Sequence, residues 1–292
     1  MTIPRILIIA GSDSGGGAGI QADIKTVTML GGHAMTAITA ITAQNTLGVD
    51  AVHPVPTDMV IAQIDSVVRD IGVDAVKIGM IGSAETAHAV ADRLATFGVP
   101  IVFDPVMVAT SGSVLADADT IAAFERLMAL ASVVTPNTPE LGALAGMTVE
   151  TELDQAAAAE CVITRTGCPA VLAKGGHLVL DGEISGVDRE GRHCRHKNSE
   201  RVFDFLYWLD ADGWHEMSWN DARIETNHTH GTGCTFASAL AVGLAEGRPL
   251  EDGISRARQF VRAALISAPG LGGGHGPMGH ALGVSPFDAL EG

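Results

Sequence analysis

The sequence is poor in basic residues and in aromatic residues. Its 292 residues contain 18 Lys and Arg against 34 Asp and Glu, which gives a formal net charge of −16. This balance argues against a nucleic-acid partner, because a surface that binds DNA or RNA needs clustered Lys and Arg. The same charge repels anionic substrates, so a phosphate site would need local compensation from helix N-termini, a lysine or Mg²⁺.

Cysteines and long apolar runs are also scarce. Cys161, Cys168, Cys194 and Cys234 have neither the paired spacing of zinc ligands nor the density of a secreted scaffold, so we expect reduced thiols in the cytoplasm. Residues 7–10 are too short for the core of a signal peptide, and no apolar stretch reaches membrane-spanning length. We therefore expect a soluble cytoplasmic protein without a membrane partner.

Small and aliphatic residues are abundant instead. The chain is 47% hydrophobic but only 4% aromatic, a composition that suits helices packed closely on a sheet. Its length can bury a substantial core. We expect a single domain over residues 1–292.

Short β-rich runs alternate with amphipathic stretches along the chain. The predicted strands are residues 5–10, 33–41, 75–78, 100–103, 132–134 and 170–173. The predicted helices are residues 19–30, 58–71, 84–97, 117–130, 139–145 and 153–166. This alternation predicts parallel strands joined by right-handed crossovers, with ligands bound at the carboxyl ends of the strands.

Residues 182–201 interrupt this pattern with a polar stretch that lacks a sustained apolar period. They include His193, Cys194 and His196, but three ligands within four residues cannot easily reach one metal ion. A solvated loop is therefore favoured over a metal clip. Residues 203–209 and 214–219 flank Asp212-Gly213 and predict a β-hairpin.

The segment His230-Gly-Thr-Gly-Cys-Thr-Phe-Ala237 places a glycine turn before an apolar helix. Because the first turn of a helix has unpaired N–H groups and a positive dipole, this turn is predicted to bind a phosphate. Gly231 and Gly233 let a ligand approach the backbone, and Thr232 adds a hydroxyl donor. We expect the helix N-terminus to lower the pKa of Cys234. The alternative is that the glycines only cap a buried helix.

Two common nucleotide-binding motifs are not satisfied. Gly17-Ala-Gly19-Ile-Gln-Ala22 matches Gly-x-Gly-x-x-Ala, but the second predicted strand ends in Thr42-Ala-Gln-Asn45, without the acid that holds a ribose. A Walker A loop needs Gly-Lys, and this dipeptide does not occur in the chain. Any ATP would therefore be held by another architecture.

Seven segments occur in the order found in the hydroxymethylpyrimidine and phosphomethylpyrimidine kinases of thiamine biosynthesis. They are residues 10–23, 42–45, 77–80, 104–107, 135–140, 174–177 and 229–234, and residues 270–277 resemble the family's C-terminal signature. These kinases are a branch of the ribokinase superfamily in which a cysteine replaces the aspartate of the Gly-x-Gly-Asp turn. The resemblance implies a ribokinase-like three-layer α/β/α sandwich with a mostly parallel central sheet.

The resemblance also implies an activity. It is the ATP-dependent phosphorylation of 4-amino-5-hydroxymethyl-2-methylpyrimidine (HMP) to HMP phosphate, and then of HMP phosphate to HMP diphosphate. Cys234 becomes the candidate base, and the amides of Gly231, Thr232, Gly233 and Cys234 the anion hole for the transferred group. Loss of the base should slow turnover by about 10²–10⁴-fold without abolishing binding.

A pyrimidine site follows from the same resemblance. Gln44 is its reader, because a side-chain amide can both donate to and accept from an aminopyrimidine edge. Asp23 and the backbone near Gly11 complete the polar contacts. The apolar contacts are assigned to Met80, Val106 and Met107, with ordinary core packing as the open alternative for the two methionines.

The nucleotide and its metal ion are assigned to neighbouring loops. Asp104 and Glu140 can supply oxygen ligands to Mg²⁺, directly or through water. Lys174, Asn137 and Thr232 are assigned to ATP. Without the resemblance, Asn137 and Glu140 fit a helix capping box equally well, and Lys174 could simply be solvated.

The chain departs from the family pattern after His177, where it is longer by about twenty residues. This insertion near residues 182–201 could shield the site, join a dimer interface or have no catalytic role, and the resemblance implies a homodimer. Two other functions stay open. One is a pyridoxal or pyridoxine kinase of the same superfamily, and the other is a non-catalytic sensor that binds the pyrimidine.

Overall fold

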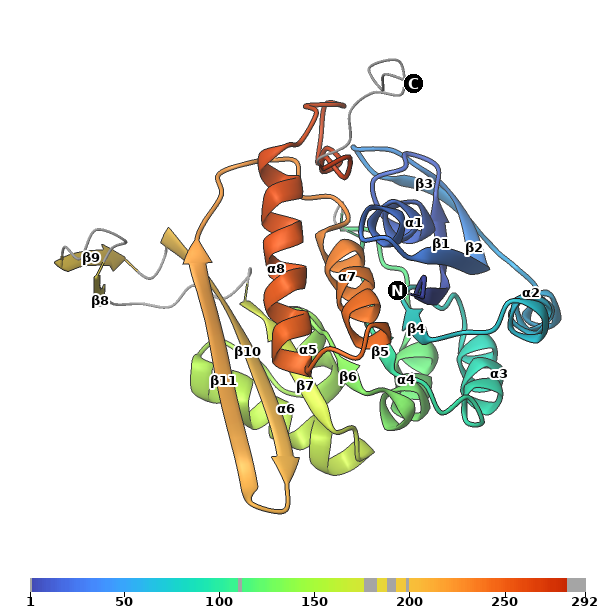
Figure 1. Ribbon diagram of the computed structural model, residues 1–292, viewed down its shortest axis with the longest axis horizontal. Helices are drawn as coiled ribbons and strands as arrows, with labels where there is room; N and C mark the ends of the chain where they lie inside the picture. The colour runs from blue at the N-terminus through green and yellow to red at the C-terminus, as the bar shows by residue number, and fades with distance from the viewer. Residues whose placement is uncertain (1, 110–111, 176–182, 188–192, 198–199, 283–292) are drawn as a thin grey trace.

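The computed structural model describes residues 2–109, 112–175, 183–187, 193–197 and 200–282. Within them a nine-stranded sheet has the order β11-β10-β7-β6-β5-β4-β1-β2-β3. Its strands are β1 (Arg5–Asp13), β2 (His33–Gln44), β3 (Val49–Pro54), β4 (Ala75–Ile78), β5 (Ile101–Phe103), β6 (Val133–Val134), β7 (Ala170–Lys174), β10 (Arg201–Asp210) and β11 (Gly213–Ala222). The strands from β7 to β2 are parallel, while β3, β10 and β11 are antiparallel to their neighbours. The expected mostly parallel sheet is confirmed (Figure 1).

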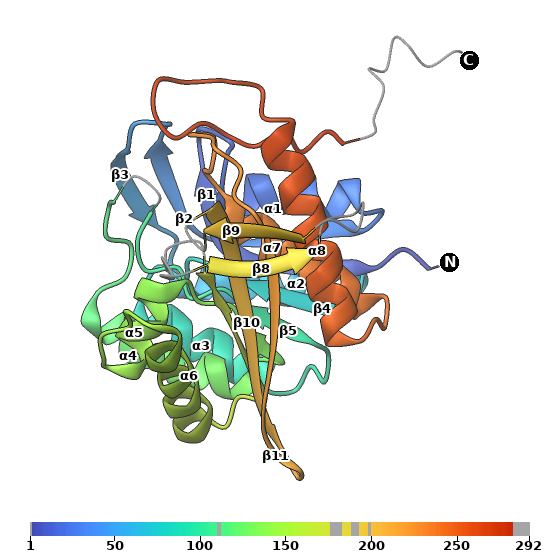
Figure 2. The ribbon, with the colours of Figure 1, turned by 90° about the vertical axis from the view of Figure 1, so that its left-hand side faces the viewer.

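Helices cover both faces of this sheet. They are α1 (Gly19–Met29), α2 (Thr57–Asp70), α3 (Ala84–Leu94), α4 (Ala118–Leu130), α5 (Thr138–Ala145), α6 (Glu152–Thr166), α7 (Thr232–Ala245) and α8 (Leu250–Ile266). Figure 2 shows α3 to α6 on one side of the sheet and α7 and α8 on the other. The three-layer sandwich is therefore confirmed. None of the helices in the described ranges is long and apolar enough to cross a membrane.

The central strand β1 explains the two layers of core. Its alternating side chains point to opposite faces of the sheet. Ile6 and Ile8 join a buried cluster with α1, α7 and α8, whereas Leu7 and Ile9 join a second cluster with α2 to α6. A strand buried on both faces reads as a continuous apolar run, as residues 6–10 do.

Helix starts differ in how they are capped. The helices α3 to α6 have side-chain caps, because Ser83, Asp117, Asn137 and Thr151 accept hydrogen bonds from first-turn amides, whereas α1, α2 and α8 have none within the described part of the chain. Helix α7 is also uncapped: it follows Gly231, which has a φ of 85°, and no described side chain caps its first turn. The N-terminus of α7 therefore keeps backbone donors available for a ligand.

Most of the predicted elements are confirmed with shifts of a few residues, and the predicted hairpin is β10–β11, with Asp210 opposite Gly213. The strand β3 and the helix α8 were not predicted. The edge strand β3 is almost entirely exposed, so it shows no apolar alternation. Helix α8 does carry a helical pattern, because Ile254, Ala257 and Phe260 are buried at three-residue spacing, and this signal could have predicted it.

The expectation of a loop over residues 182–201 is wrong in part. Strands β8 (Glu183–Val187) and β9 (His193–Lys197) pair antiparallel in a separate two-stranded sheet. A polar hairpin is held by backbone hydrogen bonds and needs no apolar period, which explains why these two strands were not predicted. The side chains of His193, Cys194 and His196 lie outside the described part, as do residues 188–192 and 198–199.

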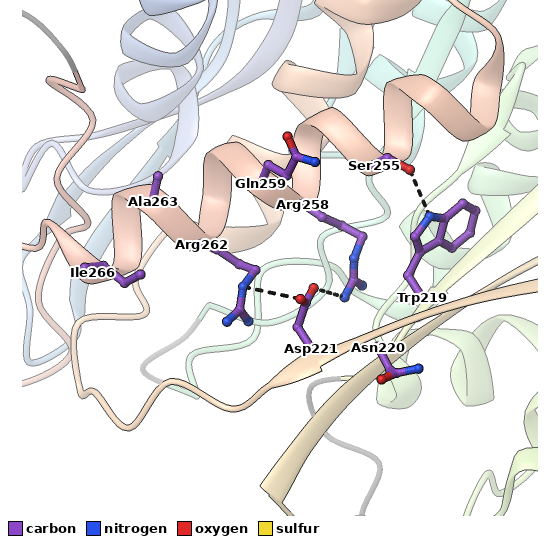
Figure 3. Close-up of a pocket in the computed structure, with 9 residues that line it drawn as sticks. All are labelled: Trp219, Asn220, Asp221, Ser255, Arg258, Gln259, Arg262, Ala263 and Ile266. Carbon is purple, nitrogen blue, oxygen red and sulfur yellow. Dashed lines mark hydrogen bonds and ion pairs between the residues drawn. The ribbon is translucent and has the colours of Figure 1, made fainter. Parts of the chain in front are cut away.

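A cavity of about 540 Å³ lies between β11 and α8. Its walls are residues 219–221 of β11 and the α8 side chains between Ser255 and Ile266 (Figure 3). The Arg258 guanidinium joins the two elements, because it forms ion pairs with Asp204 and, at 2.6 Å, with Asp221. Burial and the neighbouring Arg262 lower the pKa of Arg258 to about 10, so this arginine depends on its carboxylate partners.

We expect Arg258→Met to lower the free energy of unfolding by about 2–4 kcal/mol, because it leaves Asp204 with a poorly solvated, unpaired charge. Arg262→Met is the matched control. Its side chain is 30% exposed against 7% for Arg258, and its contact with Asp221 is longer, at 3.7 Å, so we expect a loss below about 1 kcal/mol. Urea unfolding measures both values. Equal losses would contradict this account of α8 packing.

Candidate active site

The polar residues predicted for the site lie at one edge of the sheet. Six adjacent strands are parallel, so their carboxyl ends meet at the same edge. The predicted residues lie in or just after these strands: Gly11, Gln44, Met80, Asp104, Asn137 and Lys174. The α7 turn reaches the same edge, because a Cβ on Gly233 would lie 3.2 Å from Lys174 Nζ and 3.3 Å from Asp104 Oδ2. The structure therefore brings the predicted phosphate turn against a charged pair.

Lys174, Asp104 and Glu140 form the charged centre of this edge. Lys174 Nζ lies 2.7 Å from Asp104 Oδ1, and the Thr135 hydroxyl donates to the same oxygen at 3.2 Å. Burial raises the pKa of Glu140 to about 7, with Lys174 opposing this rise and Asp104 adding to it. Two carboxylates thus share one ammonium, and a cation would relieve the repulsion between them.

Glu140 has a structural partner as well. The backbone N–H of Asn137 donates to Glu140 Oε2 at 2.8 Å, and the Glu140 N–H donates to Asn137 Oδ1 at 2.9 Å. The capping-box alternative for α5 is therefore confirmed. In the described ranges no group of three or more His, Cys, Asp or Glu side chains is placed to hold a metal ion. Asp104 and Glu140 would need further ligands from phosphates or water.

The predicted low pKa of Cys234 is wrong for the protein without ligands. Burial raises the pKa of this thiol to about 11; Lys77 opposes the rise, while Asp23 and Asp104 add to it. Removing the thiol from water and placing it near two carboxylates both disfavour the thiolate. At neutral pH Cys234 therefore holds its proton.

A buried ion pair beneath the turn was missed by the sequence reasoning. Lys77 Nζ lies 2.9 Å from Asp23 Oδ2, and both side chains are 0% exposed. The Ser238 hydroxyl of α7 donates to the other Asp23 oxygen at 2.7 Å. Burial favours a neutral Lys77, but Asp23, Cys234 and Asp104 together hold its pKa above the ordinary value. A lysine inside the apolar strand 75–78 was the available signal, because such a residue needs a buried partner.

Asp23 is therefore engaged on both carboxylate oxygens. The contact from Asp23 to substrate stays a prediction, since the described arrangement aims this side chain at Lys77 and Ser238. Its evident role is to tie α1 to β4 and α7 under the site.

The first glycine loop is organised by Asp13, which was not predicted as a site residue. Its carboxylate accepts the backbone N–H groups of Gly15, Gly17 and Ala18 at 2.8–2.9 Å. His230 Nε2 lies 2.9 Å from Asp13 Oδ2. An aspartate before a glycine run is a known turn signal, so the sequence did contain a hint.

The two glycine loops touch each other closely. A Cβ on Gly231 would lie 2.0 Å from the Gly17 carbonyl oxygen, and Gly231 also has a φ of 85°. Only glycine satisfies both conditions. Gly231 thus brings the first loop and the α7 turn together.

The pyrimidine residues lie on the β2 side of this junction. The half-buried Gln44 amide lies 3.1 Å from Thr42 Oγ1 and 3.3 Å from His230 Nε2. Half-buried Met80 approaches Gly11, where an added Cβ would lie 2.9 Å from its sulfur. Val106 is half-buried, but Met107 is only 5% exposed and packs in the core. The core-packing alternative is thus confirmed for Met107.

The C-terminal glycine run closes this side. The His275 N–H donates to the Thr46 carbonyl at 2.9 Å, and the His230 N–H donates to the Gly276 carbonyl at 3.2 Å. Farther on, His280 Nε2 lies 2.8 Å from the Thr235 hydroxyl of α7. Residues 270–277, which resemble the family's C-terminal signature, therefore contact both the loop after β2, at Thr46, and the α7 turn, at His230.

Comparison with known proteins agrees with this geometry. The family model for phosphomethylpyrimidine kinase matches residues 13–279. The chain belongs to this family. The chain is 47% identical to the hydroxymethylpyrimidine/phosphomethylpyrimidine kinase of Rhizobium meliloti over 278 residues. The aligned region covers 94% of this chain and 96% of that protein.

Two further relatives define the range of this likeness. The thiamine biosynthesis bifunctional protein ThiED of Geobacter sulfurreducens is 44% identical to this chain over 279 residues. The aligned region covers 95% of this chain but only 52% of ThiED, so the chain spans about half of that protein. Among solved structures, an ADP complex of Bacillus subtilis pyridoxal kinase has a TM-score of 0.80 and 31% identity, covering 96% of this chain and 98% of that one. The ribokinase-like fold is confirmed.

We expect the alkylation of Cys234 by iodoacetamide to keep accelerating above pH 10, because the thiolate reacts and burial holds the pKa near 11. Peptide mapping by mass spectrometry follows this residue separately from the other cysteines. Lys77→Met should move the profile to still higher pH, since it removes the buried cation that lowers the pKa of this thiol. A plateau below pH 8.5 would instead support the low pKa expected from the helix N-terminus.

Proposed function

We propose that this protein is an ATP-dependent kinase that phosphorylates HMP and then HMP phosphate in thiamine biosynthesis. The observation that carries the proposal is the uncapped α7 turn, whose Gly233 lies against the Lys174–Asp104 pair with Cys234 next in the chain. Helix amides and a lysine are suited to hold phosphates. The family membership supports the same activity.

The chemistry requires positioning and charge neutralisation more than covalent participation. In the first step the HMP hydroxyl oxygen attacks the γ-phosphorus of ATP, the bond to the bridging oxygen of ADP breaks, and the hydroxyl proton leaves. Lys174 and the amides of residues 231–234 would hold the phosphates, with Thr232 and Asn137 as further contacts. Bound Mg²⁺ would neutralise phosphate charge, with Asp104 and Glu140 as its protein ligands.

Cys234, which follows Gly233 in the α7 turn, is our candidate to accept the hydroxyl proton. The thiol must first lose its own proton, and the buried Lys77 ammonium favours that loss. The second step differs, because its attacking atom is a phosphate oxygen that needs no base. Removing Cys234 should therefore slow the first phosphorylation more than the second.

The cavity between β11 and α8 is our candidate for the nucleoside of ATP. Arg258 in its wall pairs with Asp204, and Asp204 accepts the N–H of Gly175, the residue after Lys174. The cavity therefore flanks the lysine assigned to the phosphates. Its volume lies in the range of small-molecule sites.

Pyridoxal kinase is the second candidate, because the B. subtilis pyridoxal kinase structure superposes well on this chain. A non-catalytic sensor is disfavoured by the intact cluster of Lys174, Asp104 and Cys234. We further propose the cytoplasm as the compartment and a homodimer as the assembly, as the family resemblance implies. Analytical ultracentrifugation tests the assembly.

Purified protein with ATP and Mg²⁺ should convert HMP to its diphosphate through the monophosphate, as followed by product mass. We expect Cys234→Ala to slow the first phosphorylation by about 10²–10⁴-fold with smaller changes in KM. When HMP phosphate is the only substrate offered, the same substitution should reduce the rate of phosphorylation less. Turnover of pyridoxal without HMP would favour the second candidate, and binding without turnover would favour the sensor.

A substitution that fills the cavity tests the nucleoside assignment. We expect Ala263→Trp to raise the KM for ATP at least about tenfold, because the indole occupies the space between α8 and β11. The KM for HMP should change little, since Gln44 lies on another part of the sheet edge. Leu250→Trp, at the opposite end of α8, is the control. An unchanged KM for ATP would exclude this cavity.

A further inference from the structure

His230 joins two residues that come from different strands. Its Nε2 atom lies 2.9 Å from Asp13 Oδ2, at the end of β1, and 3.3 Å from the side-chain amide of Gln44, at the end of β2. His230 and Asp13 are both buried. One ring nitrogen therefore faces both the residue that organises the first glycine loop and the candidate pyrimidine reader.

The contact with Asp13 decides whether this nitrogen carries a hydrogen. Burial opposes ionisation of Asp13, but His230 and the amides of Ala18 and Gly15 hold its pKa below the ordinary value. Asp13 is thus a carboxylate, which can only accept hydrogen bonds. His230 Nε2 must therefore be protonated and donate to Asp13.

A protonated ring nitrogen cannot accept a hydrogen bond from Gln44. If Gln44 turned its NH₂ group toward His230, two donors would face each other. A half-turn of the amide exchanges its nitrogen and oxygen in nearly the same positions. With the oxygen toward His230, the same N–H can be shared between Asp13 and Gln44.

Thr42 independently requires the same orientation. Its hydroxyl has one hydrogen, which it donates to the Ser12 carbonyl at 2.9 Å, the shorter of its two contacts. The Thr42 oxygen lies 3.1 Å from the Gln44 side-chain amide, and because its hydrogen is already used, it can only accept a hydrogen bond there. The NH₂ group of Gln44 satisfies it, and the Gln44 oxygen is left on the His230 side.

We propose that His230 is a positioning residue that orients the Gln44 amide, with oxygen toward His230 and nitrogen toward Thr42, and thereby makes the site selective for an aminopyrimidine over an oxopyrimidine. An amide free to rotate could match either ring, because the two rings present donor and acceptor in opposite order. A fixed amide matches only one. The ligand in this statement rests on the proposed function, whereas the orientation does not.

Selectivity is the first test. The kcat/KM for HMP is divided by that for its analogue with an oxo group in place of the 4-amino group. We expect His230→Leu to lower this ratio at least about tenfold, chiefly through the KM for the pyrimidine. His230→Gln should keep the ratio within about threefold, because its terminal NH₂ can occupy the position of Nε2 and donate to both neighbours. The KM for ATP reports any damage to the phosphate turn.

Two outcomes of this assay overturn the proposal. One is unchanged selectivity in His230→Leu, and the other is equal loss in His230→Gln and His230→Leu, which would indicate a purely structural role for the ring. A double replacement with Gln44→Met adds a further check. If His230 acts through Gln44, the two effects on selectivity will not be additive.

The second test does not depend on activity. Long-range ¹H–¹⁵N NMR of protein labelled at histidine distinguishes protonated from unprotonated ring nitrogens, and His230→Gln assigns the signal by its disappearance. We expect a hydrogen on Nε2, and an unprotonated Nε2 overturns the proposal. If neither HMP nor its analogue binds, the proposed function fails, while this spectrum still decides the orientation of Gln44.

Discussion

The carboxylate of Asp13 holds together two parts of the chain that are more than two hundred residues apart. Three backbone amides of the first glycine loop and His230 of the α7 turn converge on it. Because a buried carboxylate is costly unless it is fully hydrogen-bonded, each partner is held in place by the others. The close contact of Gly17 with Gly231 depends on this link. The phosphate turn and the pyrimidine residues are thus parts of one assembly.

Electrostatics divide this assembly into two levels. Beneath the turn, Lys77 and Asp23 are a closed pair without access to solvent. Above it, Lys174, Asp104 and Glu140 carry one positive charge against two carboxyl groups. In a chain with a net charge of −16, Lys174 at the end of β7 and the amides at the start of α7 are the local positive groups that an anionic ligand needs. The remaining carboxylate excess suits a bound cation.

Much of the fold was predictable from the chain because its signals are local. Short β-rich runs predicted the central strands, and the Asn137–Glu140 spacing offered the cap of α5 as one reading. The exposed strand β3 and the polar pair β8–β9 were not predicted, since neither buries an apolar face. Within the site, the motifs identified Gln44, Lys174 and Cys234 as candidate residues, and the structure places them at the same edge of the sheet. They did not reveal Asp13, Lys77 or His230, whose roles depend on partners far along the sequence.

The sequence by itself determined the alternation of strands and helices, the gathering of the motif residues at the carboxyl ends of the strands, and the glycine turn before α7. These follow from periodicity and backbone stereochemistry, which act over a few residues. Only the tertiary structure decided the ionisation of Cys234, the pairing of Lys77 with Asp23 and the hydrogen bonds around His230. Their physical reason is burial: removing water makes each charge and each donor depend on the groups that folding places beside it.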